Sequence, residues 1–98
     1  MGVRMTTQAR RKWTFLTNHG HVLVYVHRNP DARVRDIATA VGITERAAQT
    51  ILSDLEESGY LRKTKVGRRN TYSVNTRGSF RHPEEAGHRI GVLLNLFE

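Results

Sequence analysis

The stretch that decides the fold covers residues 34–55 and reads VRDIATAVGITERAAQTILSDL. Its first eight residues place three apolar side chains on one side of a helix: Ile37, Ala38 and Val41. Gly42 then breaks that helix, and Thr44 is a suitable N-cap for a second helix over residues 45–58. The stretch therefore predicts two short helices joined by a tight turn, either as one functional unit or as a plain helical hairpin in some other bundle.

The second helix of this pair has two different faces. Its apolar residues recur at the i, i+3, i+4, i+7 spacing of a buried stripe: Ala48, Ile51, Leu52 and Leu55. Its outward residues have the same spacing: Arg46, Gln49, Thr50 and Ser53. Solvated helix faces more often carry Glu/Lys pairs, whereas Arg, Gln and hydroxyl groups can bond base edges in DNA. Glu45 either accepts from a cytosine or simply favours the positive end of the helix dipole.

Two further helices are predicted before and after this pair. The first covers about residues 19–28, with Asn18 as its N-cap, and ends before Pro30 because the residue preceding a proline avoids the helical region. Its β-branched residues also fit a strand. The last helix is expected from Pro83 to about Phe97, since proline is tolerated in a first helical turn.

From residue 60 the hydrophobic period changes to two, which indicates a β-hairpin. Strands are predicted over residues 60–66 and 71–74, around the turn Gly67-Arg68-Arg69-Asn70, because glycine and asparagine suit the positive φ of a tight turn. The expected fold is therefore mainly α with a small β-hairpin (α+β). It consists of a three-helix core, the hairpin and a C-terminal helix.

Positive charge is concentrated in two parts of this 98-residue chain, which carries a formal net charge of +7. Residues 60–81 contain seven Lys or Arg and no acid, and residues 1–14 contain four and no acid. The segments 15–59 and 82–98 each contain two more acids than bases. A merely soluble surface intersperses both signs, so the acid-free hairpin favours a surface that faces phosphates.

Length and composition exclude several classes of protein. A chain of 98 residues fits one domain, and the absence of cysteine excludes disulfides, thiolate metal sites and cysteine nucleophiles. Five histidines without companion ligands predict no metal site, and no cofactor is predicted. No catalytic residue is assigned, because no catalytic arrangement can be assembled, so the chain is not expected to be an enzyme. The longest apolar run, residues 22–26, cannot cross a bilayer, and a cytoplasmic protein is expected.

Residues 18–75 resemble the winged helix-turn-helix transcriptional regulators of the broad MarR/ArsR class. Three stretches carry the resemblance: IATAVGIT at 37–44, LEESGYL at 55–61 and the basic hairpin at 62–74. The resemblance implies a sequence-specific regulator that binds double-stranded DNA. Its recognition helix, residues 45–58, is expected in the major groove, and its basic wing, residues 60–75, on the backbone or minor groove.

The resemblance also implies roles for individual residues. The residues expected to read bases are Arg46, Gln49, Thr50 and Ser53. The residues expected to contact the DNA backbone, at the start of the recognition helix and in the wing, are Thr44, Arg62, Lys63, Lys65, Arg68, Arg69 and Asn70. Typical MarR regulators are longer, with extra helices at both ends, and ArsR metal sensors often use cysteines, so the identity of an effector is not transferred.

The predicted last helix carries an apolar stripe that can form a protein–protein interface. Its apolar stripe is expected to form a homodimer interface through Ile90, Leu93, Leu94 and Phe97, the alternative being packing on the domain's own core. A two-fold dimer would place two recognition helices about 34–36 Å apart, one turn of DNA. The expected organisation is a basic arm (1–14), a DNA-binding domain (15–76) and a loop with a dimerisation helix (77–98).

Two other functions stay open on the sequence alone. A small basic winged helix also suits RNA binding or association with the ribosome, although only Tyr60 and Tyr72 are available on the strands to stack on bases. A winged helix that binds another protein is the second alternative, and the acid-free wing argues against it. Double-stranded DNA is therefore the expected partner.

Overall fold

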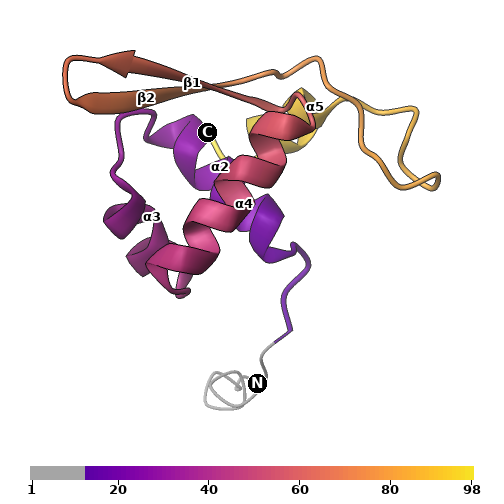
Figure 1. Cartoon of the computed structure of the whole chain (residues 1–98). Helices are drawn as coiled ribbons and strands as arrows, with labels where there is room; N and C mark the ends of the chain where they lie inside the picture. The colour runs from indigo at the N-terminus through magenta and orange to yellow at the C-terminus, as the bar shows by residue number, and fades with distance from the viewer. Residues whose placement is uncertain (1–12) are drawn as a thin grey trace.

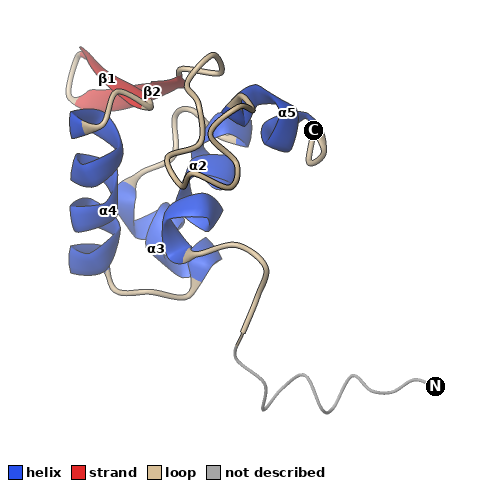
Figure 2. Ribbon diagram, turned by 90° about the vertical axis from the view of Figure 1, so that its right-hand side faces the viewer, coloured by secondary structure: helices blue, strands red, loops and turns tan. Residues whose placement is uncertain are grey.

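The computed structural model describes residues 13–98, so the predicted basic arm at residues 1–14 lies almost wholly outside the described part of the chain. The elements follow one another in this order: α2 (Asn18–Arg28), α3 (Val34–Val41), α4 (Glu45–Glu57), β1 (Leu61–Val66), β2 (Arg69–Val74) and α5 (Ile90–Asn95). Figure 1 shows the hairpin lying over the packed helices. Figure 2 shows α4 and α5 on opposite sides of α2. This arrangement confirms the predicted fold class of three helices, a hairpin and a C-terminal helix.

Capping residues set the helix boundaries. Thr17 caps α2, one residue earlier than predicted, and its side-chain oxygen accepts from the Gly20 amide at 3.2 Å. Thr44 caps α4 as predicted and accepts from the Ala47 amide at 3.0 Å. Gly42, between α3 and α4, has a φ of 85°, which glycine adopts without the steric cost of a side chain. The predicted helix–turn–helix pair is confirmed, and the segment before it is a helix rather than a strand.

One hydrophobic core contains residues from every element. Its buried members are Val22, Leu23, Val26, Ile37, Ala38, Ala48, Ile51, Leu52, Leu55, Leu61, Tyr72, Ile90 and Leu94. The predicted stripe on α4 is buried in full. Each valine, leucine or isoleucine side chain contributes about 1.5–3 kcal/mol to stability when it is fully buried. The core therefore fixes α4 so that its opposite, polar face is turned to solvent.

The wing is a two-stranded antiparallel hairpin with a shorter turn than predicted. The register pairs Leu61 with Val74 and Val66 with Arg69, which leaves only Gly67 and Arg68 in the turn. Gly67 has a φ of 65°, and a type II′ turn requires a positive φ at this first central position. The prediction that Arg69 and Asn70 belong to the turn was wrong, because a two-residue turn of this type matches the twist of the strands and lets the ladder begin at once.

The prediction of a last helix from Pro83 to about Phe97 was wrong over its first half. The helix α5 covers only Ile90–Asn95. Residues 76–89 instead form a loop, which Figure 1 shows in orange to yellow, projecting away from the helices. Ser79 and Arg89 form an isolated antiparallel bridge at the base of this loop, and turns rather than a helix occupy residues 83–87. Gly87 also disfavours a helix there, by about 1 kcal/mol relative to alanine.

Candidate nucleic-acid interface

The exposed face of α4 carries the four residues predicted to read bases. Arg46, Gln49, Thr50 and Ser53 are all exposed and lie opposite the buried stripe. The Thr50 hydroxyl donates to the Arg46 carbonyl oxygen at 3.1 Å, so Thr50 keeps its lone pairs and its methyl group for a ligand. Thr44 only accepts within the cap, which leaves its own proton available to a phosphate oxygen.

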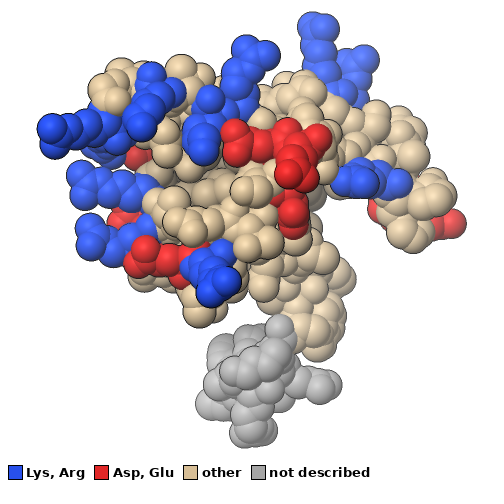
Figure 3. All heavy atoms as spheres, in the orientation of Figure 1, with Lys and Arg blue, Asp and Glu red and all other residues tan. Residues whose placement is uncertain are grey.

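Negative charge on α4 is concentrated towards its C-terminal end. Arg46 and Glu45 balance each other in its first turn, whereas Asp54, Glu56 and Glu57 lie towards its C-terminal end. Figure 3 shows these acids as a red group over that end of α4, with Lys and Arg side chains around it. The Glu56 carboxylate lies 4.0 Å from Lys63 Nζ, so this cation of the wing is already paired. The acids of α4 therefore repel a polyanion from its second half, whereas its first half carries no net charge and presents the positive end of the helix dipole.

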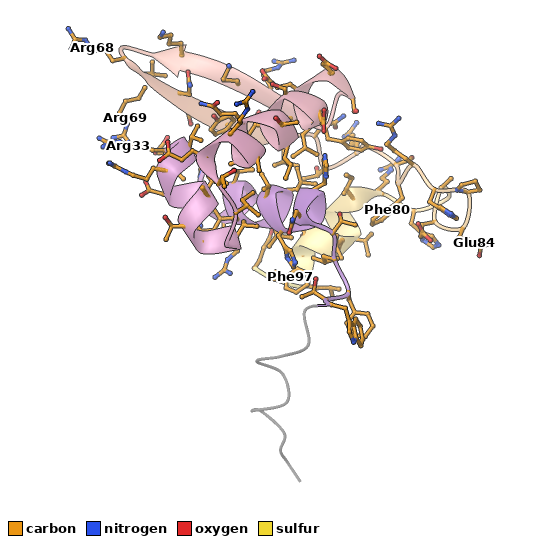
Figure 4. All side chains as sticks on the ribbon, turned by 60° about the horizontal axis from the view of Figure 1, so that its bottom comes forward. Arg33, Arg68, Arg69, Phe80, Glu84 and Phe97 are labelled. Atoms are coloured by element: carbon orange, nitrogen blue, oxygen red, sulfur yellow. The ribbon has the colours of Figure 1, made fainter. Side chains whose placement is uncertain are left out.

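The alternation of side chains along the strands divides the predicted wing residues between two faces. Lys63, Lys65 and Asn70 share the face of the hairpin that carries the buried Tyr72, whereas Arg62 and Arg69 lie on the opposite face. Arg68 occupies the turn, and Figure 4 shows its side chain at the far end of the wing, directed away from the body. The wing therefore offers cations on both faces and at its tip.

Two arginines that the sequence analysis did not single out join this basic surface. Arg33 and Arg35 are exposed at the start of α3, where the Arg33 amide donates to the Asp36 carboxylate at 3.3 Å. Figure 4 shows Arg33 beside Arg69 of the wing. No feature of the sequence predicts this proximity, because the segment that contains Arg33 carries a net excess of acids.

The connection between α2 and α3 packs along β2, close to the tip of the wing. Three hydrogen bonds join them: Tyr72 N to Pro30 O at 2.9 Å, Arg69 Nη2 to Asp31 O at 3.0 Å, and Thr71 Oγ1 to Asp31 Oδ1 at 2.9 Å. The sequence analysis missed Asp31 and Thr71, because no periodicity or motif links two polar residues 40 positions apart. One guanidinium nitrogen of Arg69 is thus already bonded within the protein.

Tyr72 anchors the base of the wing in the core. Its ring is buried, and its strand neighbour across the hairpin is Lys63. Burial, and then the nearby Glu56 carboxylate, raise the pKa of the Tyr72 phenol above its ordinary value, while a hydrogen bond with the Asn70 side chain lowers it. The neutral phenol is therefore the form that the fold accommodates.

The short α5 exposes less of its predicted stripe than expected. Ile90 and Leu94 are 5% and 1% exposed and pack in the domain's own core, and Leu93 is half-buried. The apolar side chains that α5 and the following residues leave in solvent are Val92, Leu96 and Phe97. Among the four residues predicted to form a dimer interface, Phe97 is the one that is exposed.

A cleft of about 920 Å³ lies between the start of α2, the end of α4 and the loop before α5. Two polar pairs line it, His19 with Asp54 and Arg81 with Ser58, each at 2.8 Å. Within residues 13–98, no three His, Asp or Glu side chains are grouped as a metal site requires. In the same part of the chain, no helix has the length and apolarity needed to cross a membrane.

Comparison with known proteins places this fold in a family. The model of the MarR family matches residues 14–69, from just before α2 into the wing. Similar solved structures include MepR, a transcription regulator of the Staphylococcus aureus multidrug efflux pump MepA, with 24% identity, a TM-score of 0.54, and coverage of 70% of this chain and 53% of that chain. The PcaV transcriptional regulator from Streptomyces coelicolor has 21% identity, a TM-score of 0.54, and coverage of 84% and 60%.

The AntR antimony-specific transcriptional repressor has 19% identity and a TM-score of 0.54, and the match covers 99% of this chain and 90% of that chain. Comparison with curated proteins gives no significant match. The chain spans about half the length of MepR, and at these identities the structural likeness shows the fold alone. The family model, however, matches more than half of the 98 residues, including the whole helix–turn–helix pair. The chain therefore belongs to the MarR family of winged helix-turn-helix transcriptional regulators.

Proposed function

We propose that this protein regulates transcription by binding double-stranded DNA sequence-specifically, with α4 in the major groove and the wing on the adjacent backbone or minor groove. One observation carries the proposal: the polar face of α4 is exposed, and a hairpin with exposed Lys and Arg side chains follows this helix directly in the chain. MarR-family regulators are not enzymes, which confirms the expectation from the sequence.

Arg46 and Gln49 are the residues that we assign to base recognition first. An arginine can bond guanine O6 and N7 together, and a glutamine can bond adenine N6 and N7 together. Thr50 is one turn away from Arg46, and its methyl group suits contact with a thymine methyl. Ser53 lies next to Asp54, so we place it at the border of the contact, where the acids of α4 limit how far the helix lies in the groove.

The backbone contacts are assigned to residues on either side of that face. Thr44 has a hydroxyl proton available at the start of α4, where the helix dipole also favours a phosphate. Arg68 at the tip and Lys65 near it are exposed cations without a carboxylate partner among the described residues. Arg62 and Lys63 lie nearer the base of the wing, and Lys63 faces Glu56, so we expect them to contribute less.

We also propose that the protein acts as a homodimer, as MarR regulators typically do. The exposed apolar residues Val92, Leu96 and Phe97 support a contact through the C-terminal end of the chain. Ile90 and Leu94 would act indirectly, by fixing α5 on the core. Such a dimer suits an inverted-repeat operator with half-sites about 34–36 Å apart. The expected cytoplasmic location follows from this proposal, because the protein must reach its operator.

The test is fluorescence anisotropy with random duplex DNA and with a structured RNA, across a series of salt concentrations. The proposal predicts duplex binding with a log–log salt slope on the order of −5 or steeper, because several phosphates are neutralised together. Absence of duplex binding at low salt would refute it. Binding to the RNA alone would then support the RNA-binding alternative, and binding to neither would support a protein partner. A selection from random duplexes would then identify the preferred operator.

A further inference from the structure

Asp31 is an acid on the side of the molecule where the cations of the proposed interface gather. It is exposed, follows α2 directly after Asn29 and Pro30, and its carbonyl oxygen accepts from the guanidinium of Arg69. A carboxylate near a DNA backbone weakens binding by repulsion. The hydrogen bonds of Asp31 indicate a structural role that offsets this loss of DNA affinity.

Asp31 is bonded to β2 through both its main chain and its side chain. Its carbonyl oxygen accepts from Arg69 Nη2 at 3.0 Å, and its Oδ1 accepts from Thr71 Oγ1 at 2.9 Å. The Thr71 hydroxyl also lies 3.4 Å from the Pro30 carbonyl oxygen, but its single proton favours the closer carboxylate. The Tyr72 amide donates to the same Pro30 oxygen at 2.9 Å, so the contact continues along the strand.

These hydrogen bonds lie at a position on the hairpin where they can restrain the wing. A two-stranded hairpin has little stability of its own in water. The core holds the wing at its base, through the buried Leu61 and Tyr72. Arg69 and Thr71 lie beyond Tyr72 towards the tip, where the other residues of the hairpin are largely exposed. The contact with Asp31 therefore restrains the outer half of the wing, which otherwise pivots about its buried base.

We propose that the Asp31–Thr71 contact is a positioning device that holds the wing at the angle at which its cations meet the DNA backbone. The proposal rests on the proposed function and adds two positioning residues to it. Arg69 belongs to the same arrangement through its bond to Asp31, whereas Arg68 at the tip is the free cation that the contact positions. The benefit is a wing ordered before binding, so that less conformational freedom is lost in the complex.

The experiment compares Thr71→Val with Thr64→Val in the full chain. Valine keeps the shape of threonine and replaces its hydroxyl group with a methyl group, and both residues are β-branched before and after the change. Thr64 is the matched control, because it pairs directly with Thr71 across the hairpin and its hydroxyl has no hydrogen bond with the described residues. Two quantities are measured: the affinity for random duplex DNA at fixed salt, and the hydrogen exchange of single backbone amides by NMR.

The proposal predicts that Thr71→Val weakens duplex binding about fivefold, as expected for the loss of one hydrogen bond to the ordered wing. The Tyr72 amide should exchange faster in this variant, while core amides such as that of Leu52 stay unchanged. Thr64→Val should change neither quantity more than about twofold. In an Asp31→Ala background, Thr71→Val should have no further effect on affinity, because its partner is already absent.

Equal affinities and equal Tyr72 exchange for the two valine variants would overturn the proposal. Faster exchange at Leu52 as well as Tyr72 would also overturn it, because that result means a general loss of stability. If the unaltered chain does not bind duplex DNA even at low salt, the proposed function fails. The positioning role is then decided by exchange alone: faster Tyr72 exchange confined to Thr71→Val supports it, and no difference rejects it.

Discussion

The Leu94→Ala substitution tests whether α5 belongs to the core of the winged helix. Leu94 is 1% exposed and shares the core with residues of α2 and α4. Removing a buried leucine side chain costs its transfer free energy and leaves a cavity, about 2–5 kcal/mol in total. A domain of this size is stabilised by only about 5–15 kcal/mol. Val66, which is 64% exposed and belongs to no proposed contact, is the control, and Val66→Ala should cost less than about 1 kcal/mol.

The assay is urea unfolding of the three proteins, followed by far-UV circular dichroism at two protein concentrations. With a slope of about 1–3 kcal/mol per molar urea, a loss of 3 kcal/mol lowers the midpoint by about 1–3 M. The core assignment predicts this shift for Leu94→Ala at both concentrations. A midpoint equal to that of Val66→Ala would refute the assignment. A shift seen only at the higher concentration would refute it too, because it would place Leu94 in a subunit contact.

Four other outcomes are expected. Thr44→Ala should lower the free energy of unfolding by about 0.5–2 kcal/mol through loss of the α4 cap, as measured by urea unfolding. Leu96→Asp should convert the proposed dimer to a monomer in sedimentation, whereas Asn95→Asp should not; a dimer that survives both would contradict the C-terminal contact. Arg68→Ala should reduce the salt slope of DNA binding by about 1 for all sequences, whereas Gln49→Ala should weaken binding to the selected operator by about 1–3 kcal/mol and spare random DNA. Stability should fall as the pH rises above about 10, because the folded chain keeps the Tyr72 proton, whose pKa is raised, more tightly than the unfolded chain does; alkaline unfolding of Tyr72→Phe should show a smaller fall.

The helix–turn–helix pair was predictable because its signals are local. Periodicity identified the buried stripe of α4, Gly42 marked the turn and Thr44 marked the next helix start, and each of these acts within one or two helical turns. The exposed face of α4 followed from the same periodicity. The residues expected to read bases could therefore be named before the fold was known, and the structure leaves all four exposed.

The C-terminal part was less predictable because its structure depends on contacts between distant residues. The stripe from Ile90 to Phe97 has helical spacing, but the preceding chain forms turns, and a bridge between Ser79 and Arg89 closes them into a loop. Periodicity also does not say which partner buries a stripe. Helical spacing predicts Ile90 and Leu94 in a dimer interface, and the structure buries both in their own domain, so the proposed contact with a second subunit rests on Val92, Leu96 and Phe97.

The distribution of charge shows why composition alone overstates the basic surface. The hairpin and the residues after it carry the excess cations in sequence, yet Lys63 faces Glu56 of α4 and Arg69 is bonded to Asp31. Arg33, from a segment with more acids than bases, lies beside the wing instead. The cations available to a phosphate backbone are therefore selected by the fold, through the angle between the wing and the α2–α3 connection. On the proposed binding mode, a change in the angle of the wing would alter DNA affinity without a change in any residue proposed to touch a base.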